Sequence, residues 1–436
     1  LTPLEPWIAG KIGAADQALT REALAAYQLD KLRETLDRVR TKSPFYRLKL
    51  ARAPSRLETL DDLAAFPFTT ADDLRAGPLQ LLCVSQGEIQ RVVTLETSGT
   101  SGSPKRLYFT LEDQELTVDF FQVGMSTLVD PGDRVLILLP CERPGSVGDL
   151  LKTGLERLGA VGIKHGLVRD TRETLETLRH ERADALVGVP VQALGLARQL
   201  QPGLPIRLKS LLLSTDHVPA AISKALEAAW GCTVYNHYGM TEMGLGGGVE
   251  CQARRGYHLR EADLYVEIVD PHSGEPLADG QYGEVVFTTL TRRGMPLWRY
   301  RTGDISRFVP GACPCGSVLK TLEPIRYRKD GIIAAGSQHF TLADLDEALF
   351  PLDGLLDFTA AARGDATALA LHITLWWNRP TLEGCAAEAA HALQHIAPLR
   401  AARRRGGLQL TTEQKQISPG TLLPPGKRII SIELMR

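Results

Sequence analysis

The residues best suited to binding an anion lie in one short stretch, Thr97-Ser98-Gly99-Thr100-Ser101-Gly102-Ser103-Pro104-Lys105. Glycine lets a backbone approach a ligand closely, hydroxyl groups donate hydrogen bonds, and the closing lysine adds a positive charge. The Gly-Lys-Ser/Thr ending of a Walker loop is absent. The stretch therefore predicts a turn that wraps a polyphosphate, and a plain surface turn is the alternative.

Three cysteines and a histidine form a second group with chemical potential: Cys251, His258, Cys313 and Cys315. Thiolates and imidazole suit tetrahedral Zn²⁺, and a site with four protein ligands is normally structural. Cys313 and Cys315 are one residue apart, which is too close for an easy disulfide. Because the two halves of the group lie far apart in the sequence, spacing alone leaves zinc and ordinary buried thiols equally open.

Length and composition limit the classes of protein to which the chain can belong. Its 436 residues are enough for two or three domains, and 50 Lys plus Arg against 51 Asp plus Glu give a net charge of −1. No overall field therefore attracts nucleic acid or anionic lipid. Apolar runs are too short to span a bilayer, and the first 30 residues lack a secretory signal pattern. We expect a cytoplasmic protein.

The seven cysteines are an odd number spread over the whole chain, which does not indicate a disulfide framework. We expect those outside the group described above to be small residues of the hydrophobic core; they are Cys83, Cys141, Cys232 and Cys385.

The elements that position these groups follow from hydrophobic patterns. Residues 20–42 predict an amphipathic helix that ends at Ser43-Pro44. Short apolar runs predict strands at 134–140, 185–190, 210–215 and 233–238. Helical patterns such as 172–182 and 218–230 separate these runs, and this alternation predicts a parallel sheet that is buried on both faces.

The pattern changes after residue 260. The runs 264–269 and 283–290 flank a Pro/Gly turn region and predict an antiparallel β unit. Further on we expect a helix at 341–350, a β-rich run at 368–376, a helix at 382–395, a solvated basic loop at 402–407 and a final strand. This last stretch predicts a separate αβ domain of about 100 residues.

Two motifs follow the anion-binding stretch, Tyr235-Asn236-His237-Tyr238-Gly239-Met240-Thr241-Glu242 and Tyr300-Arg301-Thr302-Gly303-Asp304. In this order the three motifs resemble the adenylate-forming (acyl-activating) superfamily, and most of all its phenylacetate–CoA ligase branch. The resemblance covers nearly the whole chain and includes residues 43–47 and 68–75. It implies an α/β fold with two domains. Residues 1–328 would form an AMP-binding domain of parallel βα layers plus an antiparallel β unit, and residues 329–436 a small mobile α+β lid.

The resemblance also implies roles for single residues. Lys427, Glu242 and Thr241 would be catalytic, with Glu242 holding Mg²⁺, a cation that prefers hard oxygen ligands. Tyr238 would pack near the adenine, and Asp304 would bind the ribose hydroxyls. The full nucleotide-binding set is Thr97, Ser98, Gly99, Thr100, Ser101, Gly102, Lys105, Asp216, Tyr238, Gly239, Thr241, Asp304 and Arg326.

The lid would carry Lys427, whose ammonium would bridge the substrate carboxylate and the α-phosphate. Lys329 is the candidate hinge, and the arginine beside it is either Arg326 or Arg328, since the usual Gly-Arg is missing. Rotation of the lid would separate adenylation from thiolation.

The chain departs from the family pattern at several positions. Ser214-Thr215-Asp216 replaces the usual Gly-Ala-Glu, and Asp216 can still accept from the adenine amino group or shape the pocket. The polar segment 141–149 stands where aromatic and Gly-rich residues are usual, and residues 334–337 replace an Arg-Gly element. Cys-Pro-Cys-Gly elements similar to 313–316 recur in this branch, which favours zinc as a pin for the β unit.

The resemblance implies an acid–CoA ligase that activates an aryl or otherwise compact carboxylic acid with ATP and passes the acyl group to coenzyme A. ATP/AMP, Mg²⁺, coenzyme A and a structural Zn²⁺ are the expected cofactors and co-substrates. We expect no nucleic-acid or membrane partner and leave a homodimer open. The alternatives are an acyltransferase with an amine or carrier-protein acceptor, and a nucleotide-binding homologue without catalysis.

Overall fold

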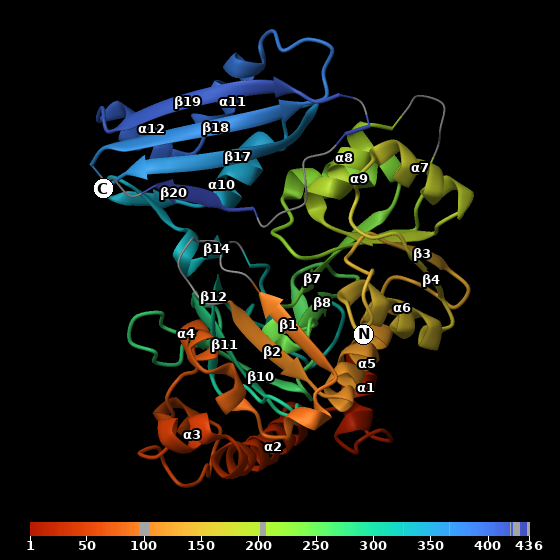
Figure 1. Ribbon diagram of the computed structural model, residues 1–436, viewed down its shortest axis with the longest axis vertical. Helices are drawn as coiled ribbons and strands as arrows, with labels where there is room; N and C mark the ends of the chain where they lie inside the picture. Colours follow the sequence, from red (N-terminus) through yellow and green to blue (C-terminus); the bar gives the residue numbers. More distant parts are fainter. Residues whose placement is uncertain are drawn as a thin grey trace. The chain divides into compact units, whose positions relative to one another are not determined.

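The computed structural model describes residues 1–95, 104–200, 206–325, 327–365, 367–418, 420–421 and 428–433 (Figure 1). The chain divides into two compact units. The first unit comprises Leu1–Pro131, Glu142–Ala160 and Tyr235–Ile325, and the second comprises Gly132–Cys141, Val161–Val234 and Arg326–Arg436. Each unit has a hydrophobic core of its own.

The first unit begins with helices. They are α1 (Leu4–Lys11), α2 (Arg21–Lys42), α3 (Pro44–Lys49), α4 (Ala71–Ala76), α5 (Leu111–Met125) and α6 (Val147–Leu158), with short 3₁₀ turns η1 (Asp61–Ala65), η2 (Pro78–Leu81), η3 (Gln86–Glu88) and η4 (Thr241–Met243). The Thr20 hydroxyl accepts from the backbone N–H of Ala23 and starts α2, while Ser43-Pro44 ends it, as predicted. Thr110 and Asp113 form a capping box that starts α5.

The strands of the first unit are antiparallel. They are β1 (Arg91–Leu95), β2 (Lys105–Phe109), β7 (Thr233–Tyr238, in this unit from Tyr235 on), β8 (Gly248–Glu250), β9 (Tyr257–Leu259), β10 (Leu264–Val269), β11 (Gly283–Thr289), β12 (Tyr300–Ser306) and β13 (Thr321–Leu322). β10, β11 and β12 form one antiparallel sheet, and β7, β8, β9 and β13 pair in that order. The antiparallel β unit predicted at 264–269 and 283–290 is confirmed.

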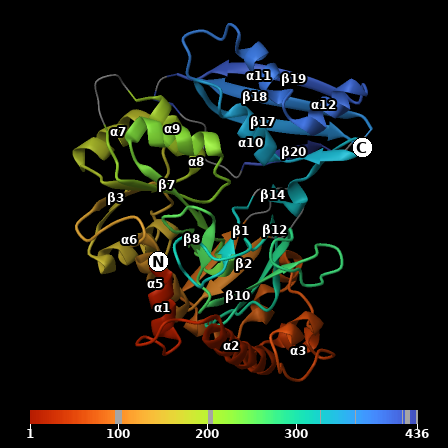
Figure 2. The ribbon, with the colours of Figure 1, turned by 180° about the vertical axis from the view of Figure 1, so that it is seen from behind.

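The second unit contains the parallel sheet. Its strands are β3 (Arg134–Ile137), β4 (Val161–Lys164), β5 (Ala185–Gly188) and β6 (Ser210–Leu213), in the order β4-β3-β5-β6, with α7 (Thr171–His180), α8 (Pro190–Arg198) and α9 (Ala220–Trp230) beside them (Figure 2). Every residue of β5 and β6 is buried. This confirms the prediction of a parallel sheet with both faces covered.

Residues 326–436 belong to the same unit. They form β14 (Tyr327–Arg328), η5 (Lys329–Gly331), β15 (Ile333–Ala335), β16 (Gln338–Phe340), α10 (Leu342–Leu349), β17 (Leu355–Gly364), β18 (Leu369–Trp377), α11 (Cys385–Leu393), α12 (Ala397–Arg404), β19 (Leu408–Gln416) and β20 (Ile430–Glu433). One sheet has the order β19-β18-β17-β20, and α11 and α12 lie along β19 (Figures 1 and 2). The predicted division between residues 328 and 329 stays a prediction.

The overall class is mixed α/β with parallel and antiparallel sheets, as predicted. The basic segment 402–407 is predicted to be a loop, but residues 402–404 are the end of α12, and only residues 405–407 lie beyond the helix. Pro398 in the first turn and the alanine and arginine residues after it favour the helix. The four cysteines expected in the core are all buried. Among the described residues, no helix is long and apolar enough to cross a membrane.

Candidate active site

A buried ion pair joins two of the predicted site residues. Lys105 opens β2, and its ammonium contacts the carboxylate of Glu242 in η4; their side chains are 18% and 6% exposed. The Tyr300 hydroxyl donates to the same carboxylate oxygen at 3.2 Å. Burial alone would raise the pKa of Glu242, but the Lys105 charge and these hydrogen bonds bring it below its ordinary value. Glu242 is therefore ionised at neutral pH.

A second pair lies beside the first. The Tyr238 hydroxyl, at the end of β7, donates to Asp304 Oδ2 at 3.0 Å, and Asp304 is 5% exposed. The Tyr238 ring stacks on Tyr257 with a centroid distance of 5.7 Å. Tyr300 and Asp304 both belong to β12, so this strand supplies one hydrogen-bond partner to η4 and another to the end of β7.

Packing requires a glycine at position 239, between Tyr238 and the Thr241-Glu242 pair. A Cβ at Gly239 would come within 2.2 Å of the Leu245 carbonyl oxygen, which is a backbone atom that cannot move aside cheaply. Thr241 follows as the first residue of η4, and its carbonyl accepts from the Gly244 N–H at 3.0 Å. The chain therefore folds back tightly between Gly239 and Leu245, and Glu242 lies within this turn.

Of the predicted site residues, Lys105, Tyr238, Gly239, Thr241, Glu242 and Asp304 come together in the first unit. Thr97, Ser98, Gly99, Thr100, Ser101 and Gly102 lie outside the described residues, as do Arg326 and Lys427. The candidate hinge residue Lys329 is exposed in η5, and the neighbouring Arg328 pairs with Asp330 at 3.3 Å.

Asp216 lies in the second unit, after β6. It adds negative charge near a buried group in which Arg428, the residue after Lys427, contacts Asp346 Oδ1 at 2.7 Å and Asp357 Oδ1 at 3.3 Å. Burial raises the pKa of Asp346 to about 6; the Arg428 charge opposes this shift and the Asp216 charge adds to it. Asp216 therefore belongs to an acidic group around a guanidinium, and its predicted contact with adenine stays a prediction.

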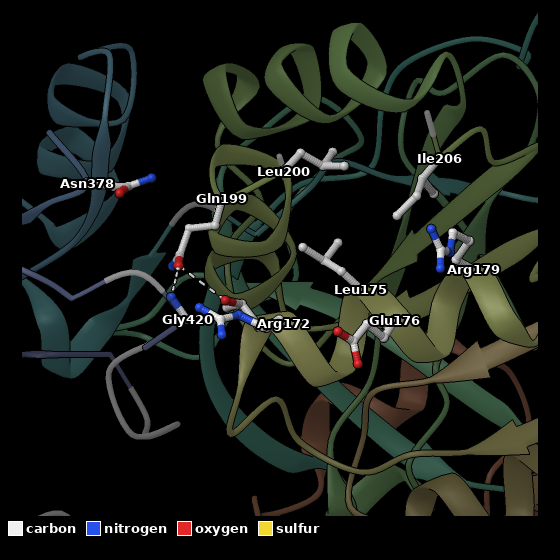
Figure 3. A pocket seen from close by; sticks show the side chains of 10 residues that line it. Arg172, Leu175, Glu176, Arg179, Gln199, Leu200, Ile206, Asn378 and Gly420 are labelled. Atoms are coloured by element: carbon white, nitrogen blue, oxygen red, sulfur yellow. Dashed lines mark hydrogen bonds between the residues drawn. The ribbon is translucent and has the colours of Figure 1, made fainter. Parts of the chain in front are cut away.

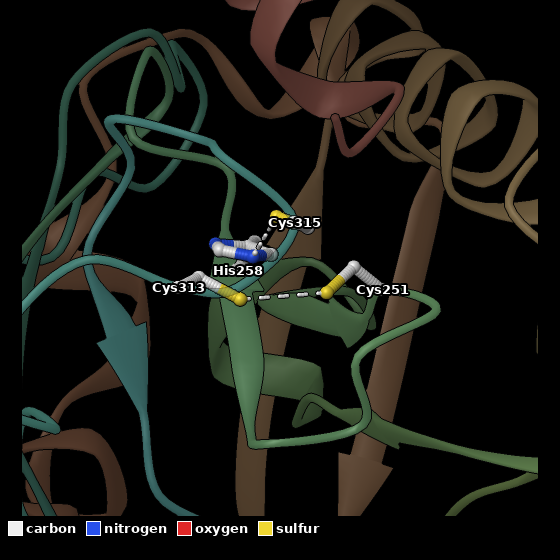
Figure 4. Close-up of side chains that lie close together, drawn as sticks. All are labelled: Cys251, His258, Cys313 and Cys315. Carbon is white, nitrogen blue, oxygen red and sulfur yellow. Dashed lines mark hydrogen bonds between the residues drawn. The ribbon is translucent and has the colours of Figure 1, made fainter.

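The predicted zinc ligands converge in the first unit (Figure 4). One potential ligand atom from each of Cys251, His258, Cys313 and Cys315 lies within 4.8 Å of all the others. The Cys251 and Cys313 sulfurs are 3.7 Å apart, and Cys315 Sγ is 3.4 Å from His258 Nε2. A tetrahedral zinc with Zn–S bonds of about 2.3 Å places two sulfurs about 3.8 Å apart. Donor chemistry and spacing both fit zinc.

A histidine of the first motif is deeply buried. The His237 ring packs against Phe120 and Phe121 of α5 at centroid distances of 6.1 and 6.3 Å. Burial, and secondarily the Arg260 charge, lower the pKa of His237 to about 4. His237 is therefore neutral at pH 7 and forms part of the hydrophobic packing against α5.

A separate cavity of about 210 Å³ lies in the second unit (Figure 3). Arg172, Leu175, Glu176 and Arg179 of α7 line it, with Gln199 among the residues opposite. None of the predicted site residues lines this cavity. Leu200 and Ile206 also line it.

The sequence reasoning missed contributors whose contacts arise only on folding. Tyr300 belongs to a quoted motif, yet nothing in the motif indicates that its hydroxyl reaches Glu242. Arg292 donates to the Glu242 carbonyl oxygen at 2.8 Å and lies in no motif. An arginine 50 residues away in sequence carries no local signal of such a contact.

Comparisons with known proteins show which family the chain resembles. Residues 87–290 match the AMP-binding enzyme family. The chain is 29% identical over 438 residues to the phenylacetate–coenzyme A ligase of Thermus thermophilus, covering 94% of this chain and 95% of that protein. It is 30% identical over 332 residues to the phenylacetate–coenzyme A ligase of Aromatoleum evansii, covering 72% of each.

A solved structure of 2-hydroxyisobutyryl-CoA ligase in the postadenylation state, in complex with 2-HIB-AMP, has a TM-score of 0.78 to this chain. The likeness covers 94% of this chain and 89% of that one at 22% identity. It confirms the fold.

Proposed function

We infer the function from the premise that this chain belongs to the adenylate-forming, AMP-binding enzymes, in their phenylacetate–coenzyme A ligase-like branch. It is an AMP-forming acid–CoA ligase. A carboxylic acid and ATP give an acyl-adenylate and pyrophosphate, and the acyl group then passes to the thiol of coenzyme A with release of AMP and a proton. The acid is an aryl or otherwise compact carboxylic acid, and the names of the relatives make phenylacetate the first candidate.

One observation carries this proposal. Three separate motifs supply Lys105, Tyr238, Glu242 and Asp304, which form two pairs, Lys105–Glu242 and Tyr238–Asp304. The strand β12 contacts both pairs, because it carries Asp304 and also Tyr300, whose hydroxyl donates to Glu242. A positive charge, an ionised carboxylate, an aromatic ring and a second buried carboxylate are what a nucleotide triphosphate requires for its phosphates, metal, base and sugar hydroxyls.

Adenylation needs positioning and charge stabilisation more than covalent help from the protein. Attack of the substrate carboxylate on the α-phosphate builds negative charge on phosphorus and on the departing pyrophosphate. Lys105 supplies a positive charge at the start of β2, directly after the hydroxyl-rich stretch, and stabilises that charge. Asp304 accepts from the ribose hydroxyls, and Tyr238 orients the Asp304 carboxylate while its ring packs near the adenine.

Glu242 fits a role as a Mg²⁺ ligand. It is a hard oxygen donor, and it is ionised because its pKa lies below the ordinary value. Bound Mg²⁺ would neutralise phosphate charge. Thr241, which precedes Glu242 at the start of η4, would lie beside the nucleotide.

The C-terminal residues complete the proposal. Lys427 would bridge the substrate carboxylate and the α-phosphate, and Lys329 would be the pivot about which residues 329–436 turn between the half-reactions. Lys427→Ala should then abolish acyl-adenylate formation and spare thioester formation from supplied adenylate. Equal loss of both half-reactions in a folded variant would contradict this role.

We also propose a structural zinc. The Cys251, His258, Cys313 and Cys315 side chains form a compact four-donor set, three of them buried. Cys251 follows β8, His258 lies on β9, and the two other cysteines precede β13, so a zinc ion would tie together three strands of one sheet. Its role would be to stabilise the sheet that also contains β7 and Tyr238.

Acid-dependent exchange of pyrophosphate into ATP, without coenzyme A, tests the function. Exchange with aryl acids, and thioester formation once coenzyme A is added, is the expected result. Exchange without coenzyme A consumption would favour an amine or carrier-protein acceptor. ATP binding without exchange across aryl, aliphatic and dicarboxylic acids would indicate a homologue without catalysis. Cytoplasmic localisation and a homodimer stay predictions.

A further inference from the structure

Three consecutive backbone carbonyls, those of residues 242–244, each accept a hydrogen bond from a buried side chain of a different segment. Arg292 Nη1 donates to the carbonyl oxygen of Glu242 at 2.8 Å, and Arg260 Nη2 donates to that of Met243. Thr117 Oγ1, from α5, donates to that of Gly244 at 2.9 Å. We call Arg292, Arg260 and Thr117 the carbonyl clamp.

The clamp also holds the other half of the ion pair. Arg292 Nη2 donates to the carbonyl oxygen of Tyr108 at 3.1 Å, and Tyr108 lies on β2 three residues after Lys105. One planar guanidinium therefore joins the strand that carries Lys105 to the turn that carries Glu242. Such a two-pronged contact favours arginine, because its planar guanidinium holds several N–H donors in a fixed fork, whereas the three N–H donors of a lysine ammonium all lie on one nitrogen.

The clamp buries two charged guanidinium groups, and removing a charge from water costs free energy. Packing alone does not explain charged residues at these positions. The residues Arg260 and Arg292 are 4% and 6% exposed, and burial lowers the pKa of both guanidinium groups. Arg260 Nη1 also donates to the carbonyl of Leu116 in α5 at 3.3 Å. Nearby Asp113 and Asp263 favour the charged forms of Arg292 and Arg260 respectively. Two buried cations are thus directed at backbone oxygens.

The turn needs such support because its backbone is left-handed. Gly244 has φ +78° and Leu245 has φ +68°. A residue with a side chain in that region costs about 1–3 kcal/mol unless its surroundings enforce the conformation. The carbonyls of residues 242–244 lie at this reversal, and the clamp holds them from outside the turn. The direction of the Glu242 side chain depends on that backbone.

We propose that the carbonyl clamp is a set of positioning residues for the adenylation half-reaction, which holds Glu242 and Lys105 in one geometry for the phosphates. The proposal rests on the role proposed above for Glu242. It predicts that weakening the clamp impairs adenylation and leaves transfer from preformed adenylate to coenzyme A unchanged.

Thr117→Val and Arg292→Lys test the clamp in the full-length protein. Thr117→Val removes one hydroxyl and keeps the shape, and Arg292→Lys keeps the charge and loses the two-pronged contact. Thr174→Val is the matched control, because Thr174 is also a buried helical threonine whose hydroxyl donates to a carbonyl, at 2.7 Å, in the second unit. Thermal melting checks that each variant is folded.

The readouts are pyrophosphate exchange, thioester formation from supplied acyl-adenylate, the Kd of ATP with Mg²⁺ by calorimetry, and amide hydrogen exchange of peptides spanning 241–246. Loss of one net hydrogen bond predicts, for the two clamp variants, adenylation slower by about 3- to 10-fold and amide exchange faster by a similar factor. The Kd of ATP should rise, and thioester formation from adenylate should match wild type.

Clamp variants that behave like Thr174→Val in adenylation and amide exchange would overturn the proposal, as would an equal loss of both half-reactions. If wild type itself shows no exchange with any acid, the proposed function fails. Amide exchange of 241–246 then decides alone whether the clamp positions this turn.

Discussion

Replacing Lys105 should destabilise the fold more than replacing Glu242, although both changes break the same ion pair. Two unit charges 4 Å apart interact by about 4 kcal/mol at an effective dielectric constant of 20. Lys105→Met leaves the Glu242 carboxylate buried without its cation, which we expect to cost about 3 kcal/mol of unfolding free energy. Glu242→Gln leaves Lys105, whose side chain is 18% exposed and can turn its ammonium toward water, so we expect about 1 kcal/mol.

The unfolding free energy of each variant should also depend on pH in a characteristic way. In wild type the pKa of Glu242 is lowered, so the pair stabilises the fold above the carboxyl's unfolded pKa, and this contribution is lost as pH falls through the folded value. In Lys105→Met burial dominates and raises that pKa, so the deficit relative to wild type should shrink as pH falls. The deficit of Glu242→Gln should also shrink, because the wild-type pair is itself lost at low pH.

Urea unfolding of wild type, both single variants and the double variant at several pH values measures these quantities. We expect the double variant to be more stable than the sum of the single effects predicts, by about 1–3 kcal/mol. Additive effects would contradict an energetic coupling between Lys105 and Glu242. A Glu242→Gln variant that is less stable than Lys105→Met at pH 7 would contradict the expected cost of an unpaired buried carboxylate. The refutation would hold whether or not the protein is active.

Three further predictions concern other parts of the molecule. Metal analysis of protein purified without chelators should give about one equivalent of zinc, and less than about half an equivalent would count against the four-donor site. Asp304→Asn should raise the Kd of AMP by about 10- to 100-fold, and Tyr238→Phe should raise it less because it only loosens the carboxylate; calorimetry that finds the reverse order would contradict these roles. His237 is a base with a lowered pKa, so the stability it confers is present above pH 6.5 and is lost as pH falls toward 4, by up to about 3 kcal/mol. In urea unfolding, the His237→Phe variant should lose less stability than wild type between pH 6.5 and pH 4. The same pH profile in both proteins would contradict the lowered pKa of His237.

Periodicity predicted much of the fold because the relevant elements are regular. The long helix α2, the strands β3, β5 and β6 and the β10–β11 pair lie where helical periodicity and short apolar runs predict them, whereas β4 was not predicted. The prediction of a loop at the end of α12 was wrong. A run of arginines is typical of a solvated loop, but arginine is also a good helix former. The helix α5, which supplies Thr117, was not predicted from the sequence.

The site was predictable only as far as motifs reach. Lys105, Glu242, Tyr238 and Asp304 could be named because each stands in a recognisable motif, and the structure brings them together. The contacts that fix them could not be named. Arg292 and Arg260 donate hydrogen bonds to backbone carbonyl oxygens of the turn. Every residue has such an oxygen, so the sequence does not indicate which residues accept these bonds.

The most direct test of the central claim is a crystal structure of the protein with AMP. We predict that the ribose hydroxyls lie within hydrogen-bond distance of the Asp304 carboxylate, with the adenine near the Tyr238 ring. AMP bound elsewhere, with Asp304 still paired only to protein groups, would contradict the assignment of this site and the function built on it.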